Sequence, residues 1–279
     1  MSQMDEINKE IFRHYFYSRK DICYEIIKLS KFKEMVFIDK ERARLPVRNM
    51  FIYTYDMLKE HFSQFRFFNS PTYNMYLSCA YFKNTPPFSF LPEKRREQMN
   101  AWSGVKQEPQ YKNHWAGYDF FMDFDSVKED SIDDAYKDMR KMKAVFDQYQ
   151  VPYILTFSGG KGYHLRIPYK FLPQSLGLQI VQFCKILGEN IKNKLELDTL
   201  DISIFDDRRV FKAPYSYDRG NVCLPLDDEQ AENFNISDMK VTNVLQKIKI
   251  FNRGDLMRHT NFSLEKQREH FLEFWRAMR

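Results

Sequence analysis

Close cysteine pairs are missing from this sequence. Its 279 residues include four cysteines, and no two of them form a C-x-x-C motif. Structural zinc sites usually draw their ligands from such pairs, and the six histidines lack the i, i+4 spacing of a helical metal site, so we expect no zinc. The scattered cysteines are typical of reduced packing residues, and they are Cys23, Cys79, Cys184 and Cys223.

Long apolar runs are also missing. No segment approaches the ~18 consecutive apolar residues of a membrane-spanning helix. The first ten residues, MSQMDEINKE, are polar and acidic, whereas a signal peptide has a basic and then an apolar segment. The sequence therefore predicts an intracellular protein that is neither secreted nor bound to a membrane, in the cytoplasm of a prokaryote or the nucleus of a eukaryote.

A strong charge of either sign is absent too. The 43 basic and 38 acidic residues give a net charge of +5, which permits contact with a polyanion without requiring it. Apolar residues make up 43% of the chain, as in globular proteins, and no repeat or low-complexity linker divides it. We therefore expect one α+β domain over residues 1–279, with its core at about 117–234 and helical flanks at both ends.

The outer parts of the chain show weaker periodicity. Apolar spacing predicts a helix over 7–30, and mixed strands with a short helix are expected between 37 and 68. Alternation predicts a strand over 73–82, while the polar stretch 84–115 is typical of a long loop. A C-terminal helix is expected over 263–279. Its apolar face, which suits the core or a partner surface, consists of Leu264, Phe271, Phe274, Trp275 and Met278.

The central segment has the most regular pattern. A helix is predicted over 131–150, with Ser131 as its N-cap, and a second helix over 174–197. The expected strands are 117–125, 152–157, 163–169, 200–205 and 208–214.

Two aspartates stand two positions apart in FFMDFDS, residues 120–126. In a strand, Asp123 and Asp125 project from the same side of the sheet, while Met122 and Phe124 face the other side. Like charges this close repel each other unless a cation lies between them. A bound divalent cation explains the pair, and a strand end with one solvated face is the alternative.

A glycine-rich turn follows in SGGKGYH, residues 158–164. Glycines let a ligand approach the backbone N–H groups, and Ser158, Lys161 and His164 can add hydrogen bonds and positive charge. The turn therefore predicts a phosphate-binding site. It is not the G-x-x-x-x-G-K-[ST] loop, because a strand follows where that loop has a helix. A glycine-rich hairpin with incidental lysine and histidine is the alternative.

A third acid and two cations come from TLDISIFDDRRVFKAPYSYD, residues 199–218. Asp201 lies among apolar residues, and Arg209 and Lys212 follow on a strand-like segment. Together the three segments supply what nucleotidyl transfer requires. Carboxylates bridge two divalent ions about 4 Å apart, and cations hold a triphosphate.

In this order, FFMDFD, SGGKGYH and LDISIFDDRRVFKAPYS resemble the three motifs of the archaeo-eukaryotic primase superfamily, in particular the catalytic small subunit of DNA primase. The similar region spans about 119–234. The resemblance implies that Asp123, Asp125 and Asp201 are the metal-binding catalytic acids. It also implies a nucleotide-binding set, extended upstream by a looser match in RNMFIYT, that consists of Arg48, Ser158, Lys161, His164, Arg209 and Lys212.

The same resemblance implies a fold and an activity. The fold is a single primase/polymerase catalytic domain, with a mixed β-sheet core flanked by helices, an RRM-like subdomain and no zinc module. The activity is that of a DNA primase, which uses two Mg²⁺ or Mn²⁺ ions to make short RNA or DNA primers from nucleoside triphosphates on a single-stranded DNA template. Many members of the family work with a large subunit.

The chain departs from the small-subunit pattern at several points. The short spacing between Asp125 and Ser158 has no room for a zinc module, and Asp218 stands where many members have a histidine after P-x-S. The segment before Pro214 is also slightly shorter. These differences leave open a plasmid, viral, end-joining or CRISPR-associated branch, and the non-enzyme alternative is an inactive nucleic-acid-binding subunit. For the choice of sugar, Tyr76 and Tyr118 are candidate neighbours of the 2′ position.

Overall fold

The computed structural model describes residues 18–39, 47–64, 73–83, 114–128, 131–218, 220–247 and 257–279. Residues 7–17 of the expected N-terminal helix and nearly all of the expected 84–115 loop lie outside these ranges. No helix in the described ranges is both long and apolar enough to cross a bilayer.

Two main sheets organise the molecule. The first has the strand order β2 (Val47–Met50), β1 (Lys33–Asp39), β3 (Tyr73–Phe82), β4 (Trp115–Tyr118), and β8 (Val210–Lys212) also pairs with β3. The second has the order β11 (Leu224–Pro225), β6 (Ile154–Phe157), β7 (Gly162–Ile167), β5 (Phe120–Asp125). A small hairpin joins β9 (Tyr217–Asp218) to β10 (Asn221–Val222). All of these pairings are antiparallel, which refines the expected mixed sheet.

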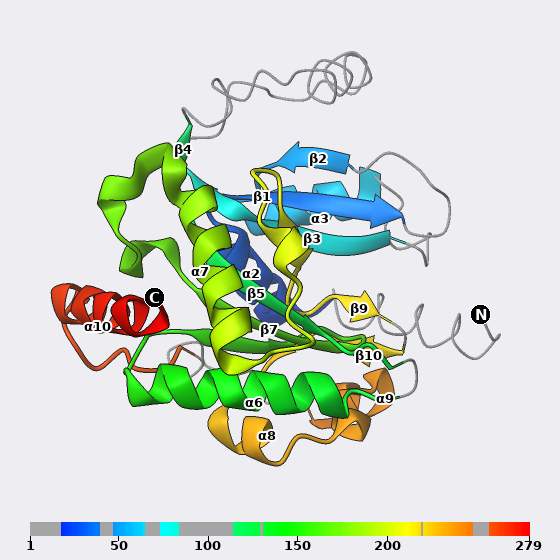
Figure 1. Ribbon diagram of the computed structural model, residues 1–279. Helices are drawn as coiled ribbons and strands as arrows, with labels where there is room; N and C mark the ends of the chain where they lie inside the picture. Colours follow the sequence, from blue (N-terminus) through cyan, green and yellow to red (C-terminus); the bar gives the residue numbers. More distant parts are fainter. Residues whose placement is uncertain are drawn as a thin grey trace.

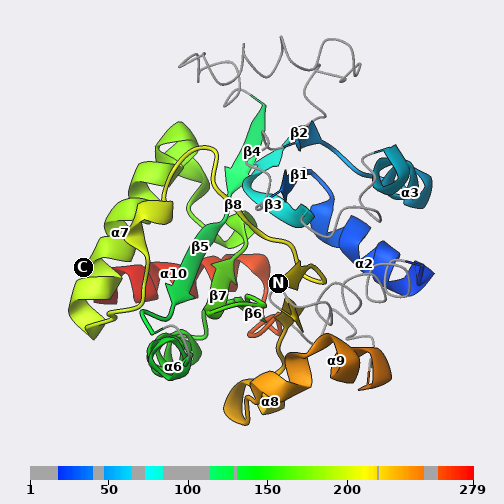
Figure 2. The same cartoon turned by 90° about the vertical axis from the view of Figure 1, so that its right-hand side faces the viewer.

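Helices cover both sheets. In Figures 1 and 2 the first sheet lies above the second, and α6 runs beneath the second sheet. The long helices are α2 (Lys20–Ser30), α3 (Tyr55–Gln64), α6 (Asp133–Gln148), α7 (Ile180–Leu195) and α10 (Leu264–Met278), and the short ones are α8 (Asp228–Glu232) and α9 (Val241–Lys247). The 3₁₀ helices are η3 (Tyr169–Phe171), η4 (Gln174–Gln179), η5 (Ile202–Ile204) and η6 (Ile236–Met239).

The second sheet has the strand order of an RRM-like unit. The chain runs β5, α6, β6, β7, α7 and then returns through residues 199–201, which pair antiparallel with the free side of β5 at Leu200 and Phe124. The spatial order is therefore the returning segment, β5, β7, β6. Along the chain, α6 follows β5, the first strand of this unit, and α7 follows β7, the third. This is the β-α-β-β-α-β arrangement that we expected for the central subdomain.

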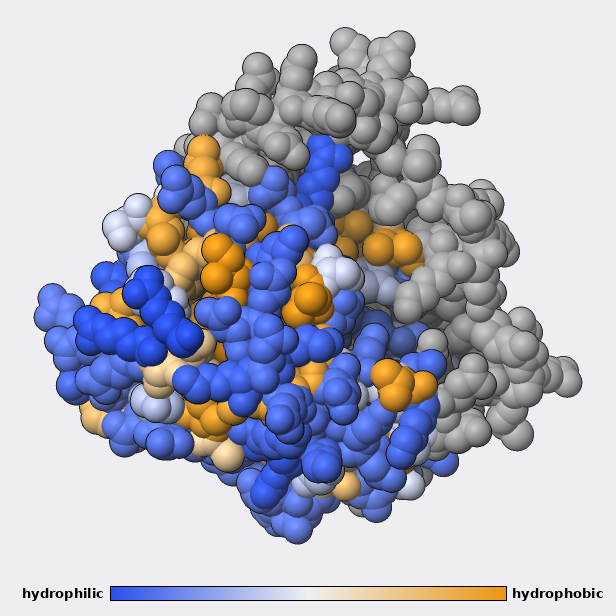
Figure 3. Space-filling view, viewed as in Figure 1, coloured by the Kyte–Doolittle hydropathy of each residue, from blue (hydrophilic) through white to orange (hydrophobic). Residues whose placement is uncertain are grey.

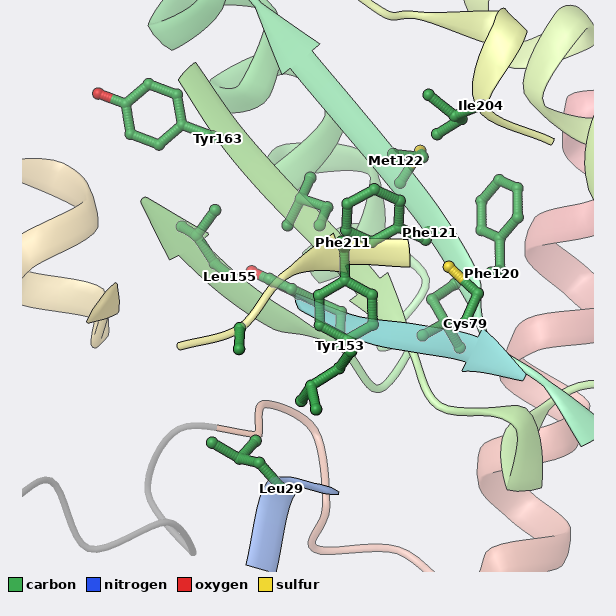
Figure 4. Packing of buried hydrophobic residues seen from close by; sticks show 14 of the residues in the cluster. Leu29, Cys79, Phe120, Phe121, Met122, Tyr153, Leu155, Tyr163, Ile204 and Phe211 are labelled. Atoms are coloured by element: carbon green, nitrogen blue, oxygen red, sulfur yellow. The ribbon is translucent and has the colours of Figure 1, made fainter. Parts of the chain in front are cut away.

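The faces of β5 divide the core from the site. Met122 and Phe124 are fully buried on the side that α6 covers, where Tyr136 of α6 lies 5.9 Å from the ring of Tyr163. On the other side, Phe121 stacks on Phe211 of β8 at 5.1 Å, in the packing between the two sheets shown in Figure 4. Since side chains alternate along a strand, Asp123 and Asp125 share the face of Phe121.

A buried ionic network joins the two sheets. Asp119, between β4 and β5, lies 3.0 Å from the ammonium group of Lys33 on β1 and accepts a hydrogen bond of 2.9 Å from Arg166 on β7. It also accepts the backbone N–H of Tyr169 at 2.8 Å. All three charged residues are at most 6% exposed, so the low dielectric of the interior strengthens their attraction.

Most predicted elements of the described ranges are found, with several corrections. The N-cap of α6 is Ile132, and Ser131 instead accepts the N–H of Asp133 with its hydroxyl at 3.1 Å. The predicted helix 174–197 starts as η4 and becomes regular only at Ile180, because Gly177 has a φ of 50°.

Two further corrections concern the segment after α7 and the C-terminus. The predicted strand 200–205 contains η5, because the carboxylate of Asp201 caps it by accepting the N–H of Ser203 at 2.8 Å. In α10, Phe271 and Phe274 are in the core, but Leu264 is 42% exposed and does not belong to the buried face. The four cysteines are free and buried, as predicted.

Candidate active site

The paired acids project from the last part of β5. Asp123 is directly opposite His164 on β7, and Asp125 is opposite Gly162. Asp123 is half-buried and Asp125 is exposed, so β5 becomes accessible to solvent at the position of the two carboxylates. The predicted alternation along this strand is confirmed.

The third acid is brought to the same strand by a backbone pairing. The N–H of Asp201 donates to the carbonyl of Asp123 at 2.9 Å, and Asp125 donates to the carbonyl of Thr199 at 3.1 Å. Thr199 is itself fixed by α6, because Asp138 accepts both its N–H and its hydroxyl at 3.0 Å. The site therefore includes residues that are far apart in the sequence.

Two cationic or imidazole groups contact Asp123. Its Oδ1 lies 3.4 Å from Nε2 of His164, and its Oδ2 lies 3.4 Å from Nη2 of Arg209. Within the described residues, Oδ1 of Asp123, Nδ1 of His164 and Nε of Arg209 are buried without a hydrogen bond. Buried polar atoms usually have partners, so these atoms point to a polar ligand.

The two carboxyl groups have opposite pKa shifts. Burial by itself raises the pKa of Asp123, but His164, Arg209 and Lys212 outweigh burial and hold this pKa below its ordinary value. Burial raises the pKa of Asp125, and the charge of Asp123 raises it further. The pair therefore carries an electrostatic repulsion that a bound cation would relieve.

The glycine turn is built around Ser158. Its hydroxyl accepts the N–H groups of Gly160 at 3.3 Å and Gly162 at 3.2 Å, so it shapes the turn from within. The N–H groups of Gly159 and Lys161 make no hydrogen bond to other described residues, and they remain as donors for an anion. Gly159 has a φ of 80°, a conformation that favours glycine.

Gly162 allows β5 and β7 to approach each other. A Cβ at this position would lie 1.6 Å from the backbone oxygen of Phe124, so no other residue fits without moving the strands. The carbonyl of Lys161 accepts the N–H of Ser126 at 3.1 Å, which fixes the turn beside the end of β5. The glycine turn and the two carboxylates are thus held next to each other.

Lys212 and Asp218 form a buried ion pair at this turn. The ammonium group of Lys212 contacts a carboxylate oxygen of Asp218, and both residues are 8% exposed. A Cβ on Gly160 would lie 3.0 Å from the Asp218 carboxylate and 3.9 Å from the Lys212 ammonium. The pair therefore lies directly over the glycine turn. The sequence pointed to Lys212 for its charge and to Asp218 only as a departure from the family pattern, and it did not indicate that the two residues pair.

The remaining residues that the sequence predicted for the site differ in how close they lie to it. Lys161 is half-exposed, and its side chain has no hydrogen bond or ion pair with other described residues. Arg48 lies on β2, and its side chain is outside the described part of the structure. Tyr76 is opposite Lys212 across β3 and β8, whereas Tyr118 is 1% exposed and donates to the carbonyl of Asp206. Only Tyr76 lies beside the site.

The donor set suits a divalent cation in part. In the described ranges, no three His, Cys, Asp or Glu side chains converge closely enough to hold a metal ion. Asp123 and Asp125 do share one face, and their carboxylate oxygens are the ligand type that Mg²⁺ prefers. One carboxylate oxygen of Asp201 accepts the N–H of Ser203 at 2.8 Å. The pair is of a type that fits a cation, and Asp201 does not complete a three-ligand set in this structure.

Comparisons with known proteins locate the fold. No protein-family model matches the chain, and a search of curated proteins finds no match. Among solved structures, the chain is similar to the polymerase domain of Mycobacterium tuberculosis Ligase D in complex with DNA, with a TM-score of 0.54 and 11% sequence identity, over 89% of this chain and 92% of that chain. At this identity the likeness establishes the fold alone. The expected fold class is confirmed: the chain has an α+β fold similar to that of a polymerase domain.

Proposed function

We propose that this protein is a metal-dependent nucleotidyltransferase that joins nucleotides along a DNA template, as enzymes of the archaeo-eukaryotic primase superfamily do. The observation that carries the proposal is the carboxylate of Asp123, held between His164 and Arg209, with Asp125 on the same face and the glycine turn beside it. The likeness of the fold to a polymerase domain supports it.

The residues of the chain then have separate roles. Asp123 and Asp125 hold divalent ions, Mg²⁺ or Mn²⁺, with Asp201 as the further ligand. When bound, such ions supply activation of the attacking hydroxyl and stabilisation of the leaving pyrophosphate. Arg209 and His164 place Asp123, and the pairing of Asp201 with β5 places the third carboxylate.

The turn and its cations bind the triphosphate in this account. The N–H groups of Gly159 and Lys161 and the ammonium of Lys161 meet its oxygens, because they have no partners among the described residues. Ser158 acts chiefly by fixing the turn. Lys212 contributes charge only when its pairing with Asp218 is loosened.

Two forms of this activity remain to be separated. The first is a DNA primase, which starts synthesis on single-stranded DNA without a primer. The second is a repair or gap-filling polymerase that extends an annealed primer. The likeness to a Ligase D polymerase domain is compatible with both forms. We propose the primase form because of the order and identity of the three motifs.

A synthesis assay separates the two forms. The protein is incubated with single-stranded DNA, Mg²⁺ or Mn²⁺ and labelled ribo- or deoxyribonucleoside triphosphates, with and without an annealed primer. A dinucleotide and short products without primer support the primase. Extension that requires the primer contradicts it in favour of the polymerase. The labelled sugar that is incorporated also shows whether the protein prefers ribo- or deoxyribonucleotides.

The partners follow from this activity. Template binding should weaken steeply with rising salt, because neutralised phosphates release counterions. A large subunit belongs to the primase form only, and the apolar face of α10 does not offer it a surface, since Phe271 and Phe274 are buried. On the face of the molecule seen in Figure 3, apolar residues are scattered among hydrophilic ones.

A further inference from the structure

A cavity lies on the same face of the second sheet as the carboxylate pair, away from that pair. It has a volume of about 570 Å³, within the ~300–1,000 Å³ range of small-molecule sites. Ile154 and Arg166 line it, and these residues are paired with each other across β6 and β7. Arg166 is two positions beyond His164, so both side chains project from one face.

Buried aromatic rings separate this cavity from the acids. Phe211 lies 5.2 Å from the guanidinium of Arg166 and 5.1 Å from Phe121, and Phe121 lies 4.9 Å from the ring of His164. None of the acids of the candidate active site lines the cavity. The two places are therefore neighbours with distinct linings.

The lining is cationic. Arg166, Lys28 and Lys170 line the cavity, and no aspartate or glutamate is among the described lining residues. Arg166 is paired with Asp119, and Lys28 lies 3.6 Å from Glu25. A cavity of this charge suits an anion.

The buried ionic network next to the cavity also has a net positive charge. Arg166 and Lys33 share the single carboxylate of Asp119, so the fully charged network carries one excess positive charge in a region that is at most 6% exposed. Burial lowers the pKa of Lys33 to about 8, against the attraction of Asp119. An anion in front of Arg166 would compensate the excess.

The cavity also has an aromatic wall. Tyr81 and Tyr169 line it, with their ring centroids 4.6 Å apart, and prolines at 168, 214 and 225 add flat apolar surface. Aromatic faces stack with planar rings, and the bases of nucleotides have such rings. The ammonium of Lys33 lies 3.8 Å from the centroid of the Tyr81 ring, and the Tyr169 ring packs on Gly117, so the remaining aromatic and proline surface is what a planar ring would contact.

We propose that this cavity binds a small phosphorylated molecule with a planar ring, in the size class of a nucleoside monophosphate, at a place separate from the carboxylate pair. The phosphate lies toward Arg166, Lys28 and Lys170, and the ring lies against the tyrosines. The inference does not require that the protein be a polymerase, because it rests on a different set of residues.

Binding without turnover tests the proposal. Deoxyadenosine monophosphate is titrated into the full chain by calorimetry in the presence of EDTA, so that divalent ions contribute nothing. Inorganic phosphate and deoxyadenosine serve as partial ligands. We expect the monophosphate to bind, and each partial ligand to bind at least about tenfold more weakly, since each lacks about 1.4 kcal/mol or more of contacts.

Matched variants locate the site. Lys28→Gln with Lys170→Gln removes two exposed cations of the cavity, and Lys137→Gln with Lys185→Gln makes the same charge change on α6 and α7. We expect the first pair to weaken binding at least tenfold and the second pair to change it less than twofold. Arg166→Lys is a further variant that keeps the buried charge for Asp119.

The outcomes that overturn the proposal are definite. Absence of monophosphate binding, or equal losses in the two double variants, contradicts it. Lys161→Gln removes the cation of the glycine turn, so a loss of binding in that variant alone would place the monophosphate at the candidate active site instead. Since no readout depends on nucleotide incorporation, failure of the proposed polymerase activity would leave this test intact.

Discussion

Lys212 and Asp218 form an ion pair that covers the glycine turn of the candidate active site. Lys212 lies on β8 of the first sheet and Asp218 on the β9–β10 hairpin, so the pair forms only when the chain has folded back over Gly160. As a result, the carboxylate of Asp218 competes with any phosphate for the ammonium group of Lys212.

We therefore predict that Asp218→Asn increases the affinity for the nucleoside triphosphate. Loss of the competing charge should lower the KM for the nucleotide about fivefold, which is about 1 kcal/mol, with little change in kcat. The melting temperature should fall at the same time, because an unpaired buried ammonium is left when no nucleotide is present.

Steady-state kinetics with Asp198→Asn as the matched control checks this prediction. Asp198 is an exposed acid between α7 and η5, and its carboxylate makes no hydrogen bond or ion pair with other described residues. A rise in KM for Asp218→Asn would show that Asp218 binds the nucleotide directly, and it would contradict the competition.

A second prediction concerns Gly162. Gly162→Ala places a methyl group 1.6 Å from the backbone oxygen of Phe124, where no side-chain rotation relieves the overlap. The pairing of β5 with β7 must open, so the free energy of unfolding should fall by about 3 kcal/mol or more. Urea denaturation measures this loss.

Gly188→Ala in α7 is the control for Gly162→Ala. Its methyl group would lie 2.4 Å from a ring carbon of Phe205, a half-buried side chain that can move. Alanine also favours a helix by about 1 kcal/mol over glycine. We expect a clearly smaller loss than for Gly162→Ala, and equal losses in the two variants would refute the backbone explanation.

A third prediction follows from the buried ammonium of Lys33. Its pKa in the folded protein is lowered to about 8 from 10.5, mainly by burial. Between these two values the unfolded chain binds more protons than the folded one, so this group makes the protein more stable as pH rises from about 8 to 10.5. Below that window the cost of the buried charge is fully present.

Comparison with Lys33→Met isolates this contribution. Several tyrosines and cysteines with raised pKa values act in the opposite direction at high pH, so the difference between the two proteins is the useful quantity. As pH rises across this window, the free energy of unfolding of the wild type should increase relative to that of Lys33→Met. Lys185→Met, an exposed change on α7, should show a constant difference. If Lys33→Met also shows a constant difference, Lys33 titrates normally.

Local sequence patterns predicted the parts of the site that are formed by single elements. The alternation of Met122, Asp123, Phe124 and Asp125 fixes the two faces of β5, because side chains in a strand alternate whatever the rest of the fold does. The glycines at 159, 160 and 162 predicted a turn for an equally local reason, and Gly159 indeed has a positive φ.

The parts formed by distant segments were not predictable in this way. Asp201 joins the site through a backbone pairing with Asp123, and the hydrophobic pattern around it suggested a strand rather than η5. The pairing of β3 with β8 and the contact of Lys212 with Asp218 depend on how the two sheets meet. Local spacing carries no information on which distant segments come into contact. Only the resemblance of the motifs indicated that Asp201 and Lys212 belong to the same site as Asp123.

The central claim is that Asp123 and Asp125 form the catalytic centre of a nucleotidyltransferase. The Asn variants of both residues keep the size of the side chains and remove the two negative charges, so the fold should persist. Circular dichroism and thermal melting check that the double variant is folded. The control is Asp56→Asn with Asp198→Asn, which removes two exposed carboxylates on other elements.

The most direct measurement is the rate of nucleotide incorporation by the wild type and by Asp123→Asn, Asp125→Asn, on primed and unprimed DNA with Mg²⁺ or Mn²⁺. The account predicts incorporation by the wild type, and a loss of about a thousandfold in the double variant, which is about 4 kcal/mol of transition-state stabilisation. The control pair should retain the wild-type rate. A folded double variant that incorporates nucleotides at the wild-type rate, or a wild type that incorporates none on either template, would contradict the claim.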